Sequence, residues 1–331
     1  MAGYAVFTVE DASRVAEVRR AALTIAREEG LDESQSANVA VVATEICTNL
    51  LKHARQGEVF LTPLSDRAAP GVEILAVDRG PGMGDVRQCL VDGYSTGQSP
   101  GTGLGAISRL SQEFDIFTER DKGTVLVSQI GGAQKGKTVI GALLKPMAGE
   151  TLCGDAWAFH ESGDAVAIIV ADGLGHGMDA SRASAEAISA FRAATDLFPI
   201  PVLQRVHGAL RSTRGAAVAV AHIEIAQRGV RYSGIGNISG VISQAGKTSF
   251  MVSHSGTAGF HTPRLQEFSY TLPDEALVIM HSDGLTTSWK LDNYPGLRRS
   301  HPSVIAGVLF RDASRQRDDV CVVVTRLGRD S

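Results

Sequence analysis

The stretch DRGPGMGDVRQCLVDGYSTGQSPGTGLGAISRLSQEFDIFTERDKGT, residues 78–124, contains two glycine-rich segments and decides how the N-terminal half of the chain is interpreted. The first segment begins at Asp78, directly after the apolar run VEILAV, and continues as Arg79-Gly80-Pro81-Gly82. A carboxylate at a strand end can accept a hydrogen bond from an amino group such as that of adenine. The glycines let the backbone approach a ligand closely. Taken alone, an ordinary tight turn explains the segment equally well.

The second segment is GTGLGA, residues 101–106, and it leads into the helical run ISRLSQ. Backbone N–H groups of a glycine-rich loop at the start of a helix form a binding site for phosphate. The segment is similar to a dinucleotide-binding fingerprint, but the strand–loop–helix unit that this fingerprint needs does not precede it. As an isolated motif it is weak evidence for any one ligand.

A helix predicted over residues 33–53 carries Glu45 and Asn49 on one face, because residues four apart in a helix lie one above the other. A carboxylate can serve as a general base, and an amide oxygen can bind Mg²⁺. This pair of residue types at this spacing is also common on a solvated helix face. The pair therefore gains meaning only from its neighbours.

Residues 1–130 are predicted to alternate helices with short strands, and GGAQKGK, residues 131–137, is predicted to be a flexible linker. The apolar periodicity predicts the following elements. Helices are expected at 9–30, 33–53 and near 107–112, and strands at 58–63, 72–78, 115–119 and 124–129.

In this order, the three segments resemble the N box, the D-x-G-x-G box and the lid-plus-glycine box of the GHKL ATPases. Within that class, residues 78–124 are most similar to the RsbT-type serine/threonine kinases, and the resemblance covers about residues 5–130. It implies an N-terminal GHKL (Bergerat) ATPase domain, an α/β sandwich that uses ATP and Mg²⁺. Phosphoryl transfer needs mainly positioning and neutralisation of charge, which such a site supplies.

The same resemblance implies a role for each matching residue. Glu45 is expected to be the catalytic base that accepts the proton of the substrate hydroxyl, and Asn49 is expected to hold Mg²⁺. Asp78 is expected to bind adenine, with Thr124 beside it. The glycines assigned to nucleotide binding are Gly82, Gly103 and Gly105.

After the linker the pattern changes to apolar strand-like runs, interrupted by helical stretches near 179–195 and 202–211. Aspartates stand at the ends of these runs. Because carboxylates at the ends of adjacent strands can meet at one edge of a sheet, and hard divalent cations prefer oxygen ligands, this spacing points to a Mg²⁺ or Mn²⁺ site. Each Asp-Gly pair alone is more typical of a turn than of a metal site. The positions are Asp155, Asp172, Asp283, Asp318 and Asp319.

The aspartate pattern resembles the PPM-type phosphatases, specifically the SpoIIE branch and its short RsbX-type members, over about residues 138–328. The resemblance implies a C-terminal α-β-β-α sandwich and two ions of Mn²⁺ or Mg²⁺. It assigns Asp155, Asp172 and the carbonyl of Gly173 to bridging the metals, and Asp283 and Asp318 to completing the set. The role of Asp319 stays open. For His176, bracing of the glycine loop is favoured over contact with phosphate.

Composition limits the fold class, the kinds of partner and the cellular location that can be expected. The chain has 331 residues, a net charge of −4, 44% hydrophobic and 21% charged residues, so it is expected to form two α+β domains, residues 1–130 and 138–331. Without a basic face it is not expected to bind nucleic acid. No apolar run is long enough to span a bilayer, and the first residues lack a secretory-signal pattern. With four scattered cysteines, we expect a cytoplasmic protein.

Both motif sets together predict a bifunctional regulator of bacterial partner switching. The N-terminal domain would phosphorylate, and the C-terminal domain would dephosphorylate, a serine or threonine of a STAS-type antagonist protein. Two alternatives stay open: an N-terminal domain that only binds ATP or a partner, and a phosphatase half that is an inactive scaffold. The sequence leaves the oligomeric state open.

Overall fold

The computed structural model describes residues 4–65, 69–90, 103–132, 137–260, 264–315 and 317–328. The chain divides into two compact units. Unit 1 comprises Met1–Lys135 and Arg299–Arg311, and unit 2 comprises Gly136–Arg298 and Asp312–Ser331. The α+β class is confirmed. The division at 130 and 138 stays a prediction; residues 133–136 of its linker lie outside the described residues, and residues 299–311 pack with unit 1.

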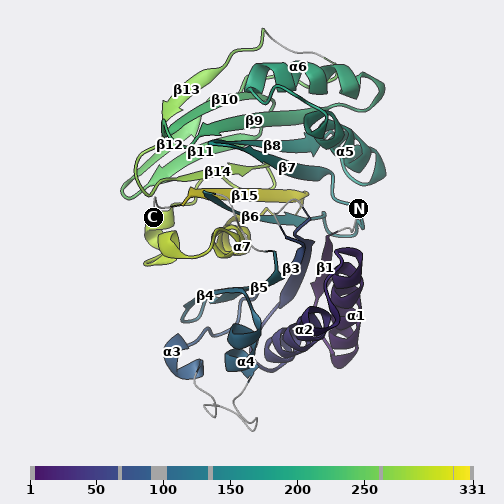
Figure 1. Ribbon diagram of the computed structural model, residues 1–331, viewed down its shortest axis with the longest axis vertical. Coiled ribbons are helices and arrows are strands. Elements are labelled where there is room, and N and C mark those ends of the chain that lie inside the picture. The colour runs from purple at the N-terminus through teal and green to yellow at the C-terminus, as the bar shows by residue number, and fades with distance from the viewer. Residues whose placement is uncertain are drawn as a thin grey trace. The chain divides into compact units, whose positions relative to one another are not determined.

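Unit 1 contains a five-stranded sheet in which every neighbouring pair is antiparallel. Three helices pack on one of its faces (Figure 1). A short helix, α3 (Val86–Cys89), precedes α4. In spatial order the strands are β1 (Ala5–Thr8), β2 (Glu58–Pro63), β3 (Gly71–Val77), β5 (Gly123–Gly131) and β4 (Glu113–Glu119), and the helices are α1 (Ala12–Glu28), α2 (Glu33–His53) and α4 (Gly103–Leu110).

Local sequence explains where the two long helices begin. The side chain of Asp11 accepts from the backbone N–H groups of Ser13 and Arg14 and so caps α1. Asp32 and Gln35 form a capping box at the start of α2, each accepting from the other's backbone N–H. These caps satisfy N–H groups that have no partner inside the helix.

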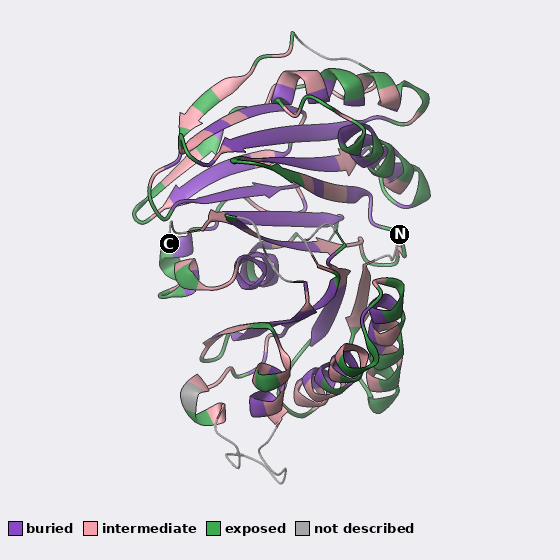
Figure 2. Cartoon of the chain, in the orientation of Figure 1, coloured by how far each residue is buried: buried purple, intermediate pink, exposed green. Residues whose placement is uncertain are grey.

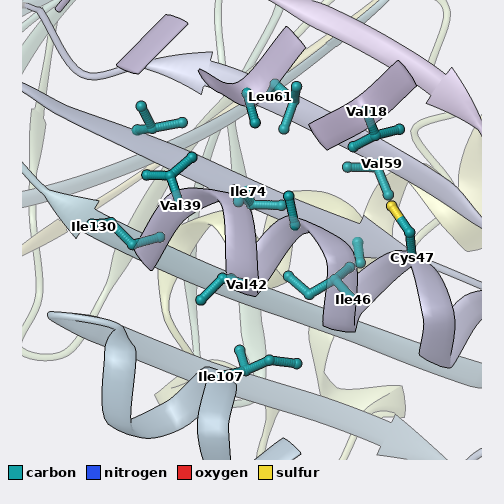
Figure 3. Packing of buried hydrophobic residues seen from close by; sticks show 14 of the residues in the cluster. Val18, Val39, Val42, Ile46, Cys47, Val59, Leu61, Ile74, Ile107 and Ile130 are labelled. Carbon is teal, nitrogen blue, oxygen red and sulfur yellow. The ribbon is translucent and has the colours of Figure 1, made fainter. Parts of the chain in front are cut away.

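The apolar stripe of α2 fixes this helix on the sheet. Val39, Val42 and Ile46 point toward Ile74 of β3 and the neighbouring strands (Figure 3), and all four side chains are buried. Ile107 of α4 closes the same cluster. This packing holds the face of α2 that bears Glu45 and Asn49 beside α4.

The opposite face of the same sheet is covered by α7 (Pro302–Ala313), from near the C-terminal end of the chain. The rings of Phe310 and Phe60 meet edge to face with their centroids 5.5 Å apart. The Ser303 hydroxyl donates to Glu73 Oε2 at 2.8 Å. Every side chain from Ser303 to Arg311 is buried, as expected for a helix that is apolar on all sides (Figure 2).

Unit 2 contains two five-stranded antiparallel sheets that pack face to face around a common apolar core. The helices α5 (Met178–Arg192) and α6 (Pro199–Ala209) cover the outer face of the first sheet (Figure 1). The first sheet has the order β13 (Phe268–Thr271), β10 (Gly229–Ile235), β9 (Ala216–Glu224), β8 (Ala165–Gly173), β7 (Asp155–Ser162). The second has the order β12 (Lys247–Met251), β11 (Ser239–Gln244), β14 (Leu277–His281), β15 (Val320–Leu327), β6 (Thr138–Lys145).

Within the described residues, no helix has the length and apolar character needed to cross a membrane. Several elements of the structure were not predicted by periodicity, namely β1, β7, β12, β13, α3 and α7. Three short 3₁₀ turns complete the description: Leu210–Ser212, Leu291–Asn293 and Leu297–Arg299.

Two helical glycines provide a matched test of the docking of α7. A Cβ at Gly307 would lie 2.7 Å from Val125 Cγ1, whereas a Cβ at Gly208 of α6 meets nothing within 4 Å. We expect Gly208→Ala to stabilise the protein by up to about 1 kcal/mol. Gly307→Ala should instead destabilise it, because overpacking costs about 1–3 kcal/mol. Chemical denaturation measures both, and equal stabilisation by the two changes would contradict the packing of α7 on β5.

Candidate functional site

Unit 1 contains a cavity of about 490 Å³ between α2, α4 and the ends of β3 and β5. Its size is within the range of small-molecule sites. Five of the residues assigned to nucleotide binding line it: Asn49, Asp78, Gly82, Gly103 and Thr124. Glu45 and Gly105 do not line the cavity in the described part of the chain; Gly105 is buried within α4.

Asp78 directly follows the last residue of β3, and hydrogen bonds to the neighbouring backbone hold it there. The Gly80 N–H donates to Asp78 Oδ1 at 2.6 Å, and the Asp78 N–H donates to the Thr124 carbonyl at 2.9 Å. Burial raises the pKa of Asp78, while hydrogen bonds to its carboxyl from the backbones of Gly80 and Thr124 and the positive charge of Arg311 oppose the rise. A buried carboxylate fixed in this way can recognise an amino group with a defined geometry.

Two glycines make the close packing of this turn possible. Gly82 has φ of +70°, and a Cβ there would collide with the carbonyl of Glu119. Gly123 has φ of +101°, and a Cβ there would collide with the carbonyl of Asp78. Both positions therefore need glycine for conformation and for space.

Glu45 and Asn49 lie beside the first residue of α4. A Cβ at Gly103 would lie 2.7 Å from Glu45 Oε2 and 3.7 Å from Asn49 Oδ1. The two helices thus bring the proposed base, the proposed metal ligand and the glycine segment together. Gly101 and Thr102, the start of that segment, lie outside the described residues.

In unit 2, Asp155 and Asp172 face each other across the antiparallel pair of β7 and β8. Asp155 is buried, and its Oδ2 accepts from the Ser282 hydroxyl at 2.6 Å. That hydroxyl in turn accepts from the Cys321 N–H at 3.0 Å. Ser282 therefore orients Asp155, and it joins the first sheet to the second at the end that carries the aspartates.

Two further contacts were missed by sequence reasoning. The side-chain amide of Asn237 donates to Asp283 Oδ2 at 2.8 Å. Asp319, left open from sequence, is buried; its Oδ1 accepts from the Met147 N–H at 2.9 Å. A Cβ at Gly154 would lie 2.7 Å from Asp319 Oδ2, so Asp319 lies close to the Asp155 strand end. Asn237 follows the strand GVRYSGI, which is the available sequence signal for it.

The aspartates of unit 2 raise one another's pKa. Burial raises the pKa of Asp172 to about 7, with further contributions from Asp283, Asp318 and Asp319. Burial also raises the pKa of Asp155 well above its usual range, reinforced by the charge of Asp172. The pKa of Asp318 is raised by burial and by Asp283. Concentrated negative charge of this kind is stabilised by a bound cation.

A metal fits this donor set by its chemistry. Asp155 Oδ1 and Asp319 Oδ2 are buried without a hydrogen-bond partner. In the described residues no three His, Cys, Asp or Glu side chains form a ready-made metal cage. Mg²⁺ does not require one, because it keeps several waters and is commonly held by one or two carboxylates. The role of each aspartate as a ligand stays a prediction.

Gly173 and His176, near this cluster, have structural partners. A Cβ at Gly173 would collide with the Ala180 carbonyl, so α5 packs directly on the backbone at this point. His176 Nδ1 lies 2.7 Å from Glu150 Oε1, an exposed pair at the loop that follows Gly173. This contact is compatible with bracing of the loop by His176.

The fold and the two sites define a class: a nucleotide-binding α/β unit joined to a two-sheet unit with carboxylates at one sheet end. A family model described as histidine kinase-like ATPase domain matches residues 8–130, and that of stage II sporulation protein E (SpoIIE) matches residues 162–328. The chain belongs to the SpoIIE family, and its N-terminal unit is a GHKL-like ATPase domain.

Two relatives from Bacillus subtilis (strain 168) match the two halves separately. The serine/threonine-protein kinase RsbT is 31% identical over 106 residues, which are 32% of this chain and 80% of RsbT. The phosphoserine phosphatase RsbX is 24% identical over 186 residues, which are 54% of this chain and 90% of RsbX. The chain thus combines an RsbT-like and an RsbX-like domain.

Solved structures agree on the fold. One solved structure is described as "The bacterial stressosome: a modular system that has been adapted to control secondary messenger signaling". It is 27% identical, with a TM-score of 0.54, and the match covers 58% of this chain and 100% of that chain. The PP2C phosphatase domain of SpoIIE from Bacillus subtilis, with a fragment of its regulatory domain, is 17% identical, with a TM-score of 0.50, and covers 96% of this chain and 94% of its own. The C-terminal unit has the PPM phosphatase fold.

The closely spaced aspartates should lower the stability of the metal-free protein and should favour metal binding. Because the folded pKa of Asp172 is about 7, above the unfolded value, its protonation stabilises the metal-free protein at low pH, and this is lost as pH rises through about 7. Asp172→Asn should therefore raise the free energy of unfolding in EDTA at pH 8 by roughly 1–3 kcal/mol, and by less at pH 5.

The same variant should lose most of the stabilisation that Mn²⁺ gives to the wild type. Asp274→Asn is the matched control, because this side chain is 90% exposed, and its effect should stay within about 0.5 kcal/mol. Thermal or chemical unfolding with and without metal measures all three proteins. A destabilised Asp172→Asn at pH 8 in EDTA would contradict the repulsion.

Proposed function

We propose that this chain both phosphorylates and dephosphorylates a serine or threonine of a STAS-type antagonist protein in bacterial partner switching. The observation that supports this most directly is that each unit has its own cluster of polar groups of the types that its proposed chemistry uses. Unit 1 brings Glu45, Asn49 and Asp78 around one cavity and its edge. Unit 2 gathers aspartates from four strand ends.

For the kinase, ATP and Mg²⁺ are the proposed ligands of the unit 1 cavity. Asp78 would bind the adenine amino group, and Thr124 lies beside it. Asn49 would hold the ion, while the N–H groups around Gly103 would bind phosphate. Glu45 lies at the edge of the cavity, with its Oε2 2.7 Å from where a Cβ at Gly103 would lie. It would accept the proton of the incoming hydroxyl.

For the phosphatase, two ions of Mn²⁺ or Mg²⁺ would supply a hydroxide nucleophile at neutral pH. Asp155 and Asp172 would hold them from opposite strands, and Asp283 and Asp318 would complete the set together with the Gly173 carbonyl. Ser282 and Asn237 would keep two of these carboxylates oriented through the hydrogen bonds that they donate. Buried Asp319 is a further ligand candidate.

The relatives support the choice of substrate class. Their names describe a serine/threonine-protein kinase and a phosphoserine phosphatase, so the two activities act on the same kind of side chain in opposite directions. In one chain, both are held at one effective concentration near a shared partner. ATP use and four free cysteines fit a cytoplasmic protein.

One observation favours a second candidate function. Glu45 does not line the cavity in the described residues, so the N-terminal unit can be viewed as an ATP-binding regulatory module without phosphoryl transfer. Single-turnover labelling with γ-labelled ATP and a STAS-domain protein separates the two. Nucleotide bound without any phosphoprotein would support the module.

For the kinase, the test is substitution of the proposed base. Glu45→Gln should reduce phosphate incorporation into a STAS-domain partner by about 10²-fold or more, because general-base catalysis contributes about 10²–10⁴. Nucleotide binding should persist, since Glu45 does not line the cavity in the described residues. Glu28→Gln, an exposed carboxylate on α1, is the control and should behave as the wild type. Undiminished labelling by Glu45→Gln would remove Glu45 from the mechanism.

For the phosphatase, hydrolysis of p-nitrophenyl phosphate by the full chain should depend on added Mn²⁺ and stop with EDTA. Asp155→Asn should lower the rate by at least about 10²-fold at any Mn²⁺ concentration, because it removes a buried carboxylate from the proposed metal site. Asp164→Asn, whose exposed carboxylate pairs with Lys137, should retain the full rate. Metal-independent hydrolysis would overturn the proposed chemistry.

A further inference from the structure

The helix α7 lies between two of the proposed metal ligands in the sequence, after Asp283 and before Asp318, yet its residues 302–311 belong to unit 1. It covers the sheet face opposite α1 and α2. The Phe310 and Phe60 rings, the Ser303 and Glu73 side chains and the fit of Gly307 against Val125 hold it there.

The last turn of α7 lies beside the turn formed by residues 78–82, which belongs to the proposed nucleotide site. Arg79, the residue after Asp78, donates from Nη2 to the carbonyl of Arg311 at 2.5 Å. The Arg311 guanidinium is buried and lies 3.8 Å from Glu119 Oε2. Glu119 supplies the carbonyl that leaves no room for a Cβ at Gly82. Arg311 therefore contacts both segments that frame Asp78 and Gly82.

Two residues beyond Arg311, the chain is hydrogen-bonded to the segment of unit 2 that follows Asp283. The Thr286 N–H donates to the Ala313 carbonyl at 3.0 Å, and the Arg315 N–H donates to the Gly284 carbonyl at 2.8 Å. A bridge between Leu285 and Ser314 lies between these bonds. This short pairing follows Asp283 directly, and Asp318 comes three residues after Arg315.

We infer that α7 couples nucleotide binding in unit 1 to the metal centre of unit 2, with Arg79 as the residue that transmits occupancy to the helix. The inference rests on the proposed function of both sites. A nucleotide on Asp78 orders the turn that contains Arg79, and thereby the end of α7. The Arg311 carbonyl that accepts from Arg79 and the Ala313 carbonyl that accepts from Thr286 are two residues apart in the chain, so ordering this end lowers the entropic cost of arranging Asp283 and Asp318 around metal.

The coupling is measured on the full chain by hydrolysis of p-nitrophenyl phosphate while buffered free Mn²⁺ is titrated, with and without the non-transferable analogue AMP-PNP. We expect AMP-PNP to lower the Mn²⁺ concentration for half-maximal hydrolysis by about five-fold or more. Arg79→Met should bind the nucleotide and lose most of this shift. Arg20→Met, an exposed arginine of α1, should keep it.

Hydrogen exchange gives a readout that needs no variant: bound AMP-PNP should slow exchange of the α7 amides in the wild type. Bound nucleotide with unchanged Mn²⁺ dependence and unchanged exchange in α7 would overturn the coupling and leave both proposed activities standing. A shift that persists in Arg79→Met would remove Arg79 as the transmitting residue. Absence of nucleotide binding or of metal-dependent hydrolysis in the wild type would instead overturn the proposed function, and the coupling with it.

Discussion

The sheet of unit 1 is apolar on both faces, and this constraint determines much of the molecule. In β3 the side chains of Val72, Ile74 and Ala76 pack under the helices, while Leu75 and Val77 face the other way, and all are buried. Strands buried on both faces need a cover on each side. The helices of the first 130 residues cover one face, and α7 covers the other.

Unit 2 shows the opposite relation between packing and function. Its core needs only complementary apolar faces, and the α5–α6 layer covers the outer side of one sheet. The strand ends, by contrast, bring together carboxylates that disfavour one another, with Asp155 directly opposite Asp172. Buried oxygens without partners on Asp155 and Asp319 add to this cost. Such an arrangement costs stability in the bare protein and is typical of functional sites.

Sequence alone predicted what depends on local pattern. The stripe of α2, most strands of both units and the positions of the aspartates follow from periodicity and turn chemistry, whereas β1, β7, β12 and β13 do not. The partners Ser282 and Asn237 could not be predicted, because they depend on which strand ends meet across two sheets. The helix α7 was missed because PSVIAGVLFRDA is apolar all round and shows no stripe. The signal for it was indirect: in the runs VEILAV and TVLVSQI, apolar residues occur at consecutive positions and so on both faces of the strand, which required a second cover that residues 1–130 do not contain.

Because of α7, the boundary between the two families in the sequence differs from the boundary between the two structural units. A cut in the predicted linker, residues 131–137, separates two families in sequence but removes the second cover of the unit 1 sheet. Phe60, Leu75 and Val125 would then be exposed to water, and burying side chains of this size is worth roughly 1.5–3 kcal/mol each. Against a total stability of about 5–15 kcal/mol for a domain, that loss is decisive. The sheet of unit 1 therefore depends for its second cover on a segment that lies between Asp283 and Asp318 in the sequence.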